Sequence, residues 1–196
     1  MKNVKSEKGL SHLFLEENKF FEWAGKQLLS LDEAIIVSHT PIVFFHEEAV
    51  GAARDYLSSL EKRFESEKLK TTYFMSHREL EINISRGHSI PDRIDSMAKW
   101  REIWNKQKNV QPLVVEDGYF PSVSLFIGKH EGKTLHTLIK ISFDKGKGQE
   151  QNPVWLGIMG DIPEFENVLI KMKKKSVLFS EYLTERMETL SNLNLE

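Results

Sequence analysis

The stretch from Ser122 to Met159 constrains the fold most, because it holds three apolar segments at the spacing of neighbouring strands. The first two segments alternate apolar and polar residues and flank the short sequence His130-Glu131-Gly132. A glycine in a short loop between alternating segments is typical of an antiparallel β-hairpin. The third segment, PVWLGIM, follows a polar stretch at 144–152 that we expect to be a mobile surface loop. The sequence therefore predicts a three-stranded unit here.

A three-residue loop in this hairpin places Lys129 opposite Lys133 and sets the pairing of both strands. The predicted pairs are Ile127 with Leu135, Leu125 with Thr137, and Val123 with Ile139. One face is then apolar, and the other is mixed because it carries Ser124, Phe126, His136, Leu138 and Lys140. A slip of one residue would destroy this segregation. We therefore expect helices to cover the apolar face and Glu131 to lie in the turn.

Periodicity classifies the remaining segments. Apolar residues at helical spacing predict helices at 11–31 and 47–65, a helix that begins at Pro91 after a Ser89 cap, and a helix over 163–196. Strand-like patterns lie at 34–37, 71–75, 80–85 and 112–116, and residues 1–10 are expected to form a loose arm. The last helix would be about 45 Å long, so we expect it to break near Lys175-Ser176 or to pack its second half on another surface.

These elements predict a single α+β domain over residues 1–196. We expect a mostly antiparallel sheet of five or six strands, helices packed on one face, and a long C-terminal helix at 163–196. Strand-rich and helix-rich segments do not alternate with the regular period of a doubly wound fold, which is why we do not predict one.

Composition narrows the class of protein. With 40% apolar residues, 29% charged residues and 12 Phe, the chain of 196 residues has the composition of a soluble globular domain. The net charge of −2 provides no overall attraction to nucleic acid or anionic lipid. The absence of cysteine excludes disulfides, thiolate metal sites and cysteine nucleophiles. Charges near the N-terminus do not fit a signal peptide, and the apolar runs are shorter than the ~18 residues of a membrane span. We expect a cytoplasmic protein with no membrane contact.

The candidate catalytic residues are His39, His46, Asp117 and His136. Imidazole and carboxylate groups act as general acids and bases, and they are common metal ligands. His39 and His46 lie near Glu47 and Glu48, but their spacing does not match the His-Glu-x-x-His zinc motif, so we predict no metal site. His77 and His130, expected at turns, are further acid–base candidates.

Asp117 with Glu131-Gly132-Lys133 has the residue types of the Asp and Glu-x-Lys set of metal-dependent nucleases. The predicted register counts against this hypothesis, because those residues should stand within strands and Glu131 falls in the turn. The chain also lacks a phosphate-binding loop, a dinucleotide fingerprint and a nucleophile elbow, and we expect no cofactor.

The candidate binding residues are Trp100, Trp104, Lys171, Lys173, Lys174 and Lys175. The tryptophans, on a predicted helix, indicate surplus aromatic surface of the kind that protein interfaces use. The lysines form the one basic cluster, but no aromatic residue alternates with them as base stacking would require. We therefore expect a non-enzymatic accessory protein that binds a protein partner or its own copy through the C-terminal helix. The alternatives are a metal-dependent hydrolase acting on a phosphodiester or nucleic acid, and nucleic-acid binding through the lysines.

Overall fold

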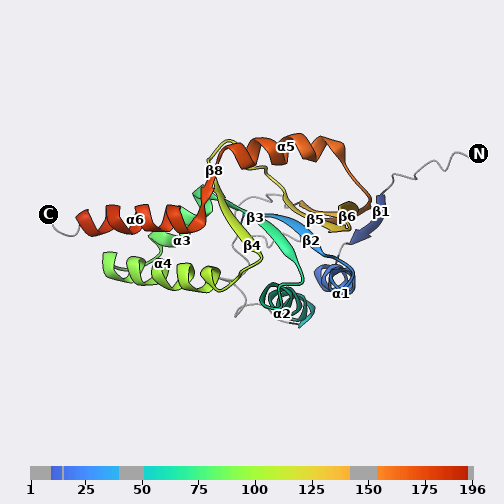
Figure 1. The fold of residues 1–196 in the computed structure, drawn as a ribbon, viewed down its shortest axis with the longest axis horizontal. Helices are drawn as coiled ribbons and strands as arrows, with labels where there is room; N and C mark the ends of the chain where they lie inside the picture. Colours follow the sequence, from blue (N-terminus) through green and yellow to red (C-terminus); the bar gives the residue numbers. More distant parts are fainter. Residues whose placement is uncertain (1–9, 15, 40–50, 142–153, 194–196) are drawn as a thin grey trace, which may run out of the picture.

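The structure is a computed structural model, and it describes residues 10–14, 16–39, 51–141 and 154–193 (Figure 1). Most of the predicted N-terminal arm and of the loop at 144–152 therefore lies outside the described residues, as does the start of the helix expected from Glu47. In the described part, no helix is long and apolar enough to cross a membrane.

The described residues form an α+β fold, as predicted. The strands are β1 (Leu10–Phe14), β2 (Glu33–Ser38), β3 (Lys70–Ser76), β4 (Val110–Val115), β5 (Ser124–His130), β6 (Lys133–Ile141), β7 (Val154–Met159) and β8 (Ser176–Leu178). The helices are α1 (Glu17–Leu28), α2 (Gly51–Glu65), α3 (His77–Ser85), α4 (Ile90–Asn105), α5 (Pro163–Lys174) and α6 (Phe179–Leu193).

The strands form one open sheet in the order β1-β7-β6-β5-β2-β3-β4-β8. The sheet is larger than the five or six strands predicted, and it is mixed because β2, β3 and β4 run parallel to one another. All other neighbours are antiparallel. The parallel pairs arise because α2 connects β2 to β3, and α3 with α4 connects β3 to β4.

Helices cover both faces of the sheet, which corrects the prediction of one covered face. The larger core lies between the sheet and α1, α2, α4 and α6, and a second core lies between the opposite face and α5 (Figure 1). Central strand β3 shows the reason, since Tyr73, Phe74 and Met75 are buried in succession. A strand packed on both faces has a continuous apolar run rather than an alternating one.

The predicted β-hairpin is present, and its turn is one residue shorter than expected. His130 pairs with Lys133, and the turn residues Glu131 and Gly132 have φ values of 48° and 73°. Positive φ at both positions is the geometry of a type I′ turn, which suits the twist of a hairpin. A shift in the register follows between Gly128 and Lys129, so the pairs are Ile127 with Thr137 and Leu125 with Ile139. The predicted partners were thus two residues away, so Leu125 and Ile139 share a face as predicted. Leu135 falls in the register shift and packs against the larger core on the opposite face, which corrects its predicted place.

Two local predictions are wrong. Residues 80–85 were expected to be a strand, but they belong to α3, where Leu80 and Ile84 lie one turn apart in the core and Ser76 accepts a bond from the Glu79 N–H. Residues 11–31 were expected to be one helix, but β1 pairs with β7 before α1 begins. The start of α4 is as predicted, with Ser89 and Asp92 forming a reciprocal capping box.

The prediction of one long C-terminal helix at 163–196 is also wrong. The chain forms two helices here, and the first ends at the position near Lys175-Ser176 where the sequence analysis allowed a break. Lys175 leaves helical geometry with φ −115° and ψ 32°, and Ser176–Leu178 then pair with β4. Met172 of α5 is buried in the second core, whereas Leu183 of α6 is buried in the first. The two helices leave β8 in opposite directions (Figure 1), because the two halves of the apolar stripe serve different faces of the sheet.

Candidate functional site

The carboxyl ends of the parallel strands gather several of the candidate residues. His39 follows β2, His77 follows β3, and Asp117 follows β4. Because β2, β3 and β4 are parallel neighbours, these positions share one edge of the sheet, which is where open sheets with parallel strands bind ligands. The segment from Glu116 to Val123 connects β4 to β5 along this edge, and its Phe120 ring lies 4.8 Å from the His39 ring.

At this edge, His77 and Asp117 form a pair of residue types that enzymes use for acid–base catalysis. The His77 Nδ1 atom lies 3.4 Å from Asp117 Oδ2, and the other oxygen of Asp117 accepts a bond of 3.0 Å from the Arg78 N–H. The carboxylate is thus held by the N-terminus of α3, where a negative charge is favoured. Both side chains are about half exposed, so the contact between them contributes little to stability.

A second polar group adjoins this pair and joins α3 to α6. The Tyr182 hydroxyl donates to Glu81, and Arg186 Nη2 donates to the other Glu81 oxygen at 2.7 Å. The Tyr182 ring lies 5.6 Å from the His77 ring in an edge-on arrangement. Burial, and then the bond to Glu81, raise the pKa of Tyr182. The phenol therefore stays protonated and acts as a structural donor, and Glu81 is occupied by two donors.

This edge can orient one imidazole, but the described residues do not complete a metal site. In the described ranges, no three His, Asp or Glu side chains are grouped so that they could hold a metal ion. His46 lies outside the described residues. His77 can therefore act as a general base or acid oriented by Asp117. The described residues add no third His, Asp or Glu to this pair that would hold a metal ion.

His136 is not part of this edge. It stands in β6 and is 1% exposed, stacked on Phe126 at 5.9 Å and in edge-on contact with Trp23 at 5.6 Å. Neither ring nitrogen has a hydrogen-bond partner among the described residues. Burial lowers the pKa of His136 to about 4. This histidine is a neutral core residue, separate from the other catalytic candidates.

The two tryptophans predicted to bind a partner were expected on the surface, but they are packed into the core. Trp104 is 3% exposed and packs between Tyr73 and Phe179, and Trp100 is partly buried against the same core. Their helical spacing reflects the face of α4 that α6 covers. Packing in the core of this protein therefore accounts for both tryptophans, and they do not form the exposed aromatic surface that was predicted.

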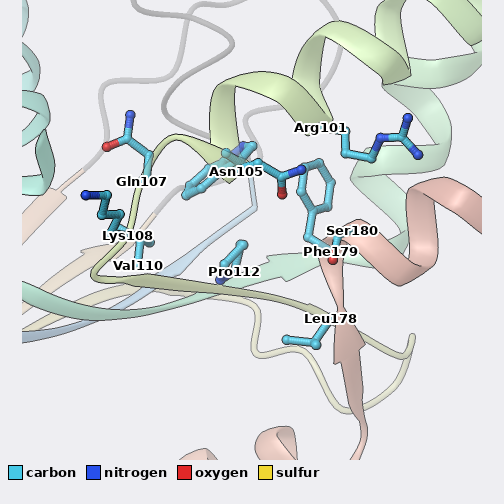
Figure 2. Close-up of a pocket in the computed structure, with 10 residues that line it drawn as sticks. Arg101, Asn105, Gln107, Lys108, Val110, Pro112, Leu178, Phe179 and Ser180 are labelled. Atoms are coloured by element: carbon cyan, nitrogen blue, oxygen red, sulfur yellow. The ribbon is translucent and has the colours of Figure 1, made fainter.

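A cavity of about 250 Å³ lies where the end of α4 meets β4, β8 and α6. Figure 2 shows the Asn105 amide facing the Phe179 ring above Pro112 and Leu178, while Arg101 and Lys108 extend away on opposite sides. Lys108 also pairs with Glu67 at 3.2 Å. No Asp, Glu or His lines this cavity, so it offers no acid–base pair.

The predicted lysines lie at the end of α5, immediately before β8. Lys175 Nζ is 4.0 Å from Glu116 and 5.3 Å from the centre of the Tyr119 ring. Lys171, Lys173 and Lys174 are exposed and form no ion pair within the part of the chain that the structure describes. They occupy the last turn of α5, where positive charge is favoured by the helix dipole.

Exposed apolar side chains border these lysines. Ile170 is 47% exposed, Val177 is 49% exposed and Leu178 is 38% exposed. We call the set the β8 surface, and it consists of Ile170, Lys171, Lys173, Lys174, Val177 and Leu178. The apolar members were missed by sequence analysis because residues 163–196 were predicted as helix, with a break considered near Lys175-Ser176 but no strand after it. The β-branched Val177, two residues after Lys175, was the one local signal against a helix.

Sequence analysis also missed the polar group formed by Glu81, Tyr182 and Arg186. They come from segments 101 and 105 residues apart, and no local spacing connects them.

No family model matches the chain, and no curated protein matches it.

Proposed function

We propose that this protein is a non-enzymatic, cytoplasmic accessory protein that acts by protein–protein contact through the β8 surface. The observation that carries the proposal is an edge strand with exposed Val177 and Leu178 beside three lysines that have no described ion-pair partner. The occupant that fits is an extended protein segment with apolar and acidic side chains.

The chemistry of an edge strand supports this occupant. β8 is the last strand in the sheet order, so its outer backbone groups have no neighbouring strand among the described residues. An extended segment that pairs with such an edge gains backbone hydrogen bonds, and side chains on both strands add specificity. Apolar groups on the segment would cover Val177 and Leu178, and carboxylates would face the lysines of α5.

A capture experiment with matched variants tests the proposal. The immobilised protein is exposed to an extract, and the bound proteins are compared for the wild type, Val177→Lys and Leu29→Lys. Leu29 is a suitable control because it is 76% exposed and directly follows α1, a helix that lies away from β8 (Figure 1). We expect a partner that the wild type and Leu29→Lys retain and that Val177→Lys loses.

The partner is then purified and titrated by calorimetry. Saturable binding that Val177→Lys weakens at least about tenfold supports the proposal. Equal capture by all three proteins, or no saturable binding of the purified candidate, contradicts it.

A second candidate function, hydrolysis of a phosphodiester, is favoured by the His77–Asp117 pair at the carboxyl ends of the strands. Bis(p-nitrophenyl) phosphate is the test substrate, with Mg²⁺, Mn²⁺ or Zn²⁺ added in turn. An enzyme would lose about 10²-fold or more of its rate in His77→Ala. Under the binding proposal, the wild type and His77→Ala give the same background rate with every metal.

A further inference from the structure

We infer that the partner of the β8 surface is a second copy of this chain, with the two β8 strands paired antiparallel about a two-fold axis. The inference rests on the proposed function and specifies its partner. It follows from the distribution of charge on the two sides of β8.

Charges of opposite sign lie before and after β8 along the chain. Lys171, Lys173 and Lys174 precede the strand, and Glu181, Glu185 and Glu188 follow it on α6. All six side chains are exposed, and none forms an ion pair among the described residues. Some exposed charges elsewhere in the described residues do have partners, such as Lys106 with Glu102 at 2.9 Å. Two full sets of opposite charge thus remain available beside one edge strand.

Antiparallel pairing brings these two sets together. When two copies of a strand pair antiparallel about its centre, the segment before the strand in one copy lies beside the segment after it in the other. With Val177 at the axis, the last turn of α5 in one copy, with Lys173 and Lys174, lies at the same end of the paired strands as the first turn of α6 in the other, with Glu181. The same arrangement repeats by symmetry. This self-complementarity is what a two-fold interface between identical chains requires.

The arrangement of the helices leaves room for this pairing. α5 and α6 leave β8 in opposite directions and pack on opposite faces of the sheet (Figure 1). The chain therefore does not fold back over the outer edge of β8 within the described residues. Exposed Val177 and Leu178 lie at the centre of the interface, and the charges surround them, as in an interface with an apolar centre and a polar rim.

A charge-exchange experiment tests the inference. One variant carries Lys173→Glu and Lys174→Glu, and the other carries Glu181→Lys and Glu185→Lys. Each variant alone places like charges opposite each other in both halves of the interface. A mixture restores opposite charges in both halves, because the altered acidic site of one copy meets the altered basic site of the other.

Sedimentation velocity provides the measurement, up to about 100 μM protein at low salt. We expect the wild type to reach twice the 22.8 kDa chain mass, each variant alone to dissociate at least about tenfold more readily, and the mixture to recover the dimer. The control with Lys62→Glu and Lys68→Glu, which lie away from β8 in sequence, should dimerise as the wild type does. Circular dichroism establishes that each variant is folded.

Three results overturn the inference: a wild type that stays monomeric, variants that dimerise alone, or a mixture that stays monomeric. A monomeric wild type that still binds a Val177-dependent partner would overturn the second copy as partner while leaving the proposed function in place. Failure of the proposed function is recognised separately, by Val177→Lys having no effect on any association.

Discussion

At the scale of single residues, His136 is the most informative side chain, because it is polar, buried and without a described hydrogen-bond partner. Such a group lowers stability, since its hydration is lost and nothing replaces it. Its contacts with Phe126 and Trp23 are those of a flat apolar group. The ring thus fills space in the larger core, and its titration is linked to folding.

The pKa of His136 predicts how stability depends on pH. Burial lowers this pKa to about 4, whereas an unfolded histidine titrates near 6.5. As pH falls from about 6.5 to about 4, the unfolded state binds a proton that the folded state does not, so this group lowers the free energy of unfolding by about 1.4 kcal/mol per pH unit. Above pH 6.5 it has no effect.

The variant His136→Leu tests this account by urea unfolding at a series of pH values. We expect the variant to be about 1 kcal/mol more stable than the wild type at neutral pH, because two unpaired polar atoms are removed. The difference should grow on the acid side, because only the wild-type protein has an unfolded state that takes up the His136 proton there. Parallel pH profiles for the two proteins would mean that His136 does not carry the linkage.

Gly128 is the residue that makes room for His136. A Cβ at this position would lie 2.7 Å from His136 Nε2 and 2.7 Å from Leu31 Cδ1. We therefore expect Gly128→Ala to lower the free energy of unfolding by about 1–3 kcal/mol. In the double variant with His136→Ala the two effects should not add, because the smaller side chain removes the clash with His136 and leaves only the close contact with Leu31. Additive losses in a double-mutant cycle would contradict the proposed contact.

At the scale of elements, the start of α4 shows how far local rules extend. Ser89 caps α4, as predicted from sequence, and the structure adds Asp92, which completes a capping box with bonds of 3.2 Å and 3.1 Å. We expect Ser89→Ala to cost about 1 kcal/mol in thermal or chemical unfolding. Ser96→Ala is the matched control, since this hydroxyl bonds only the Asp92 carbonyl within the helix. An equal loss in both variants would argue against a capping effect.

The link between α3 and α6 depends on the shared Glu81. Tyr182→Phe removes one of its two donors while leaving Arg186 in place. A hydrogen bond to a charged, part-buried group predicts a loss of about 1–2 kcal/mol. Faster amide hydrogen exchange should appear in α6, because its attachment to α3 is weakened. An unchanged exchange rate in α6 would show that α4 alone holds this helix.

Strands and caps could be predicted where the signal is local, as in the β-hairpin and in α4. The secondary structure of residues 80–85 could not be predicted, because the spacing of Leu80, Ile82 and Ile84 fits a strand as well as a helix. The Ser76 cap decided it in favour of a helix, and this cap depends on where β3 ends. The break after α5 depends likewise on three residues pairing with β4, which is a contact between distant segments.

At the scale of the whole molecule, strand order and the covered faces were beyond sequence analysis. β2 lies between β3 and β5, and the partner in β5 is some ninety residues away in sequence. The same holds for the candidate site, since Asp117 lies 40 residues after His77 and meets it only because β3 and β4 are parallel neighbours. A hydrophobic pattern predicts that a face is buried, but it does not say which element buries it.

The two ends of the sheet differ in structure. One end of the sheet is an antiparallel unit that ends with β1, and the other end is the short strand β8. An open sheet with an exposed apolar edge tends to pair with other chains unless the edge is protected. In this account the lysines and glutamates that flank β8 select its own copy as the partner.

Hydrogen exchange measured as a function of protein concentration tests whether two β8 strands pair. If they do, amides of 170–188, which include β8 and both flanking charge sets, gain protection as the concentration rises through the dimerisation range. Amides of α1 and the Leu29 region should not change, and Val177→Lys should abolish the gain. Exchange in 170–188 that is independent of concentration, or a gain located on another surface, would contradict the account.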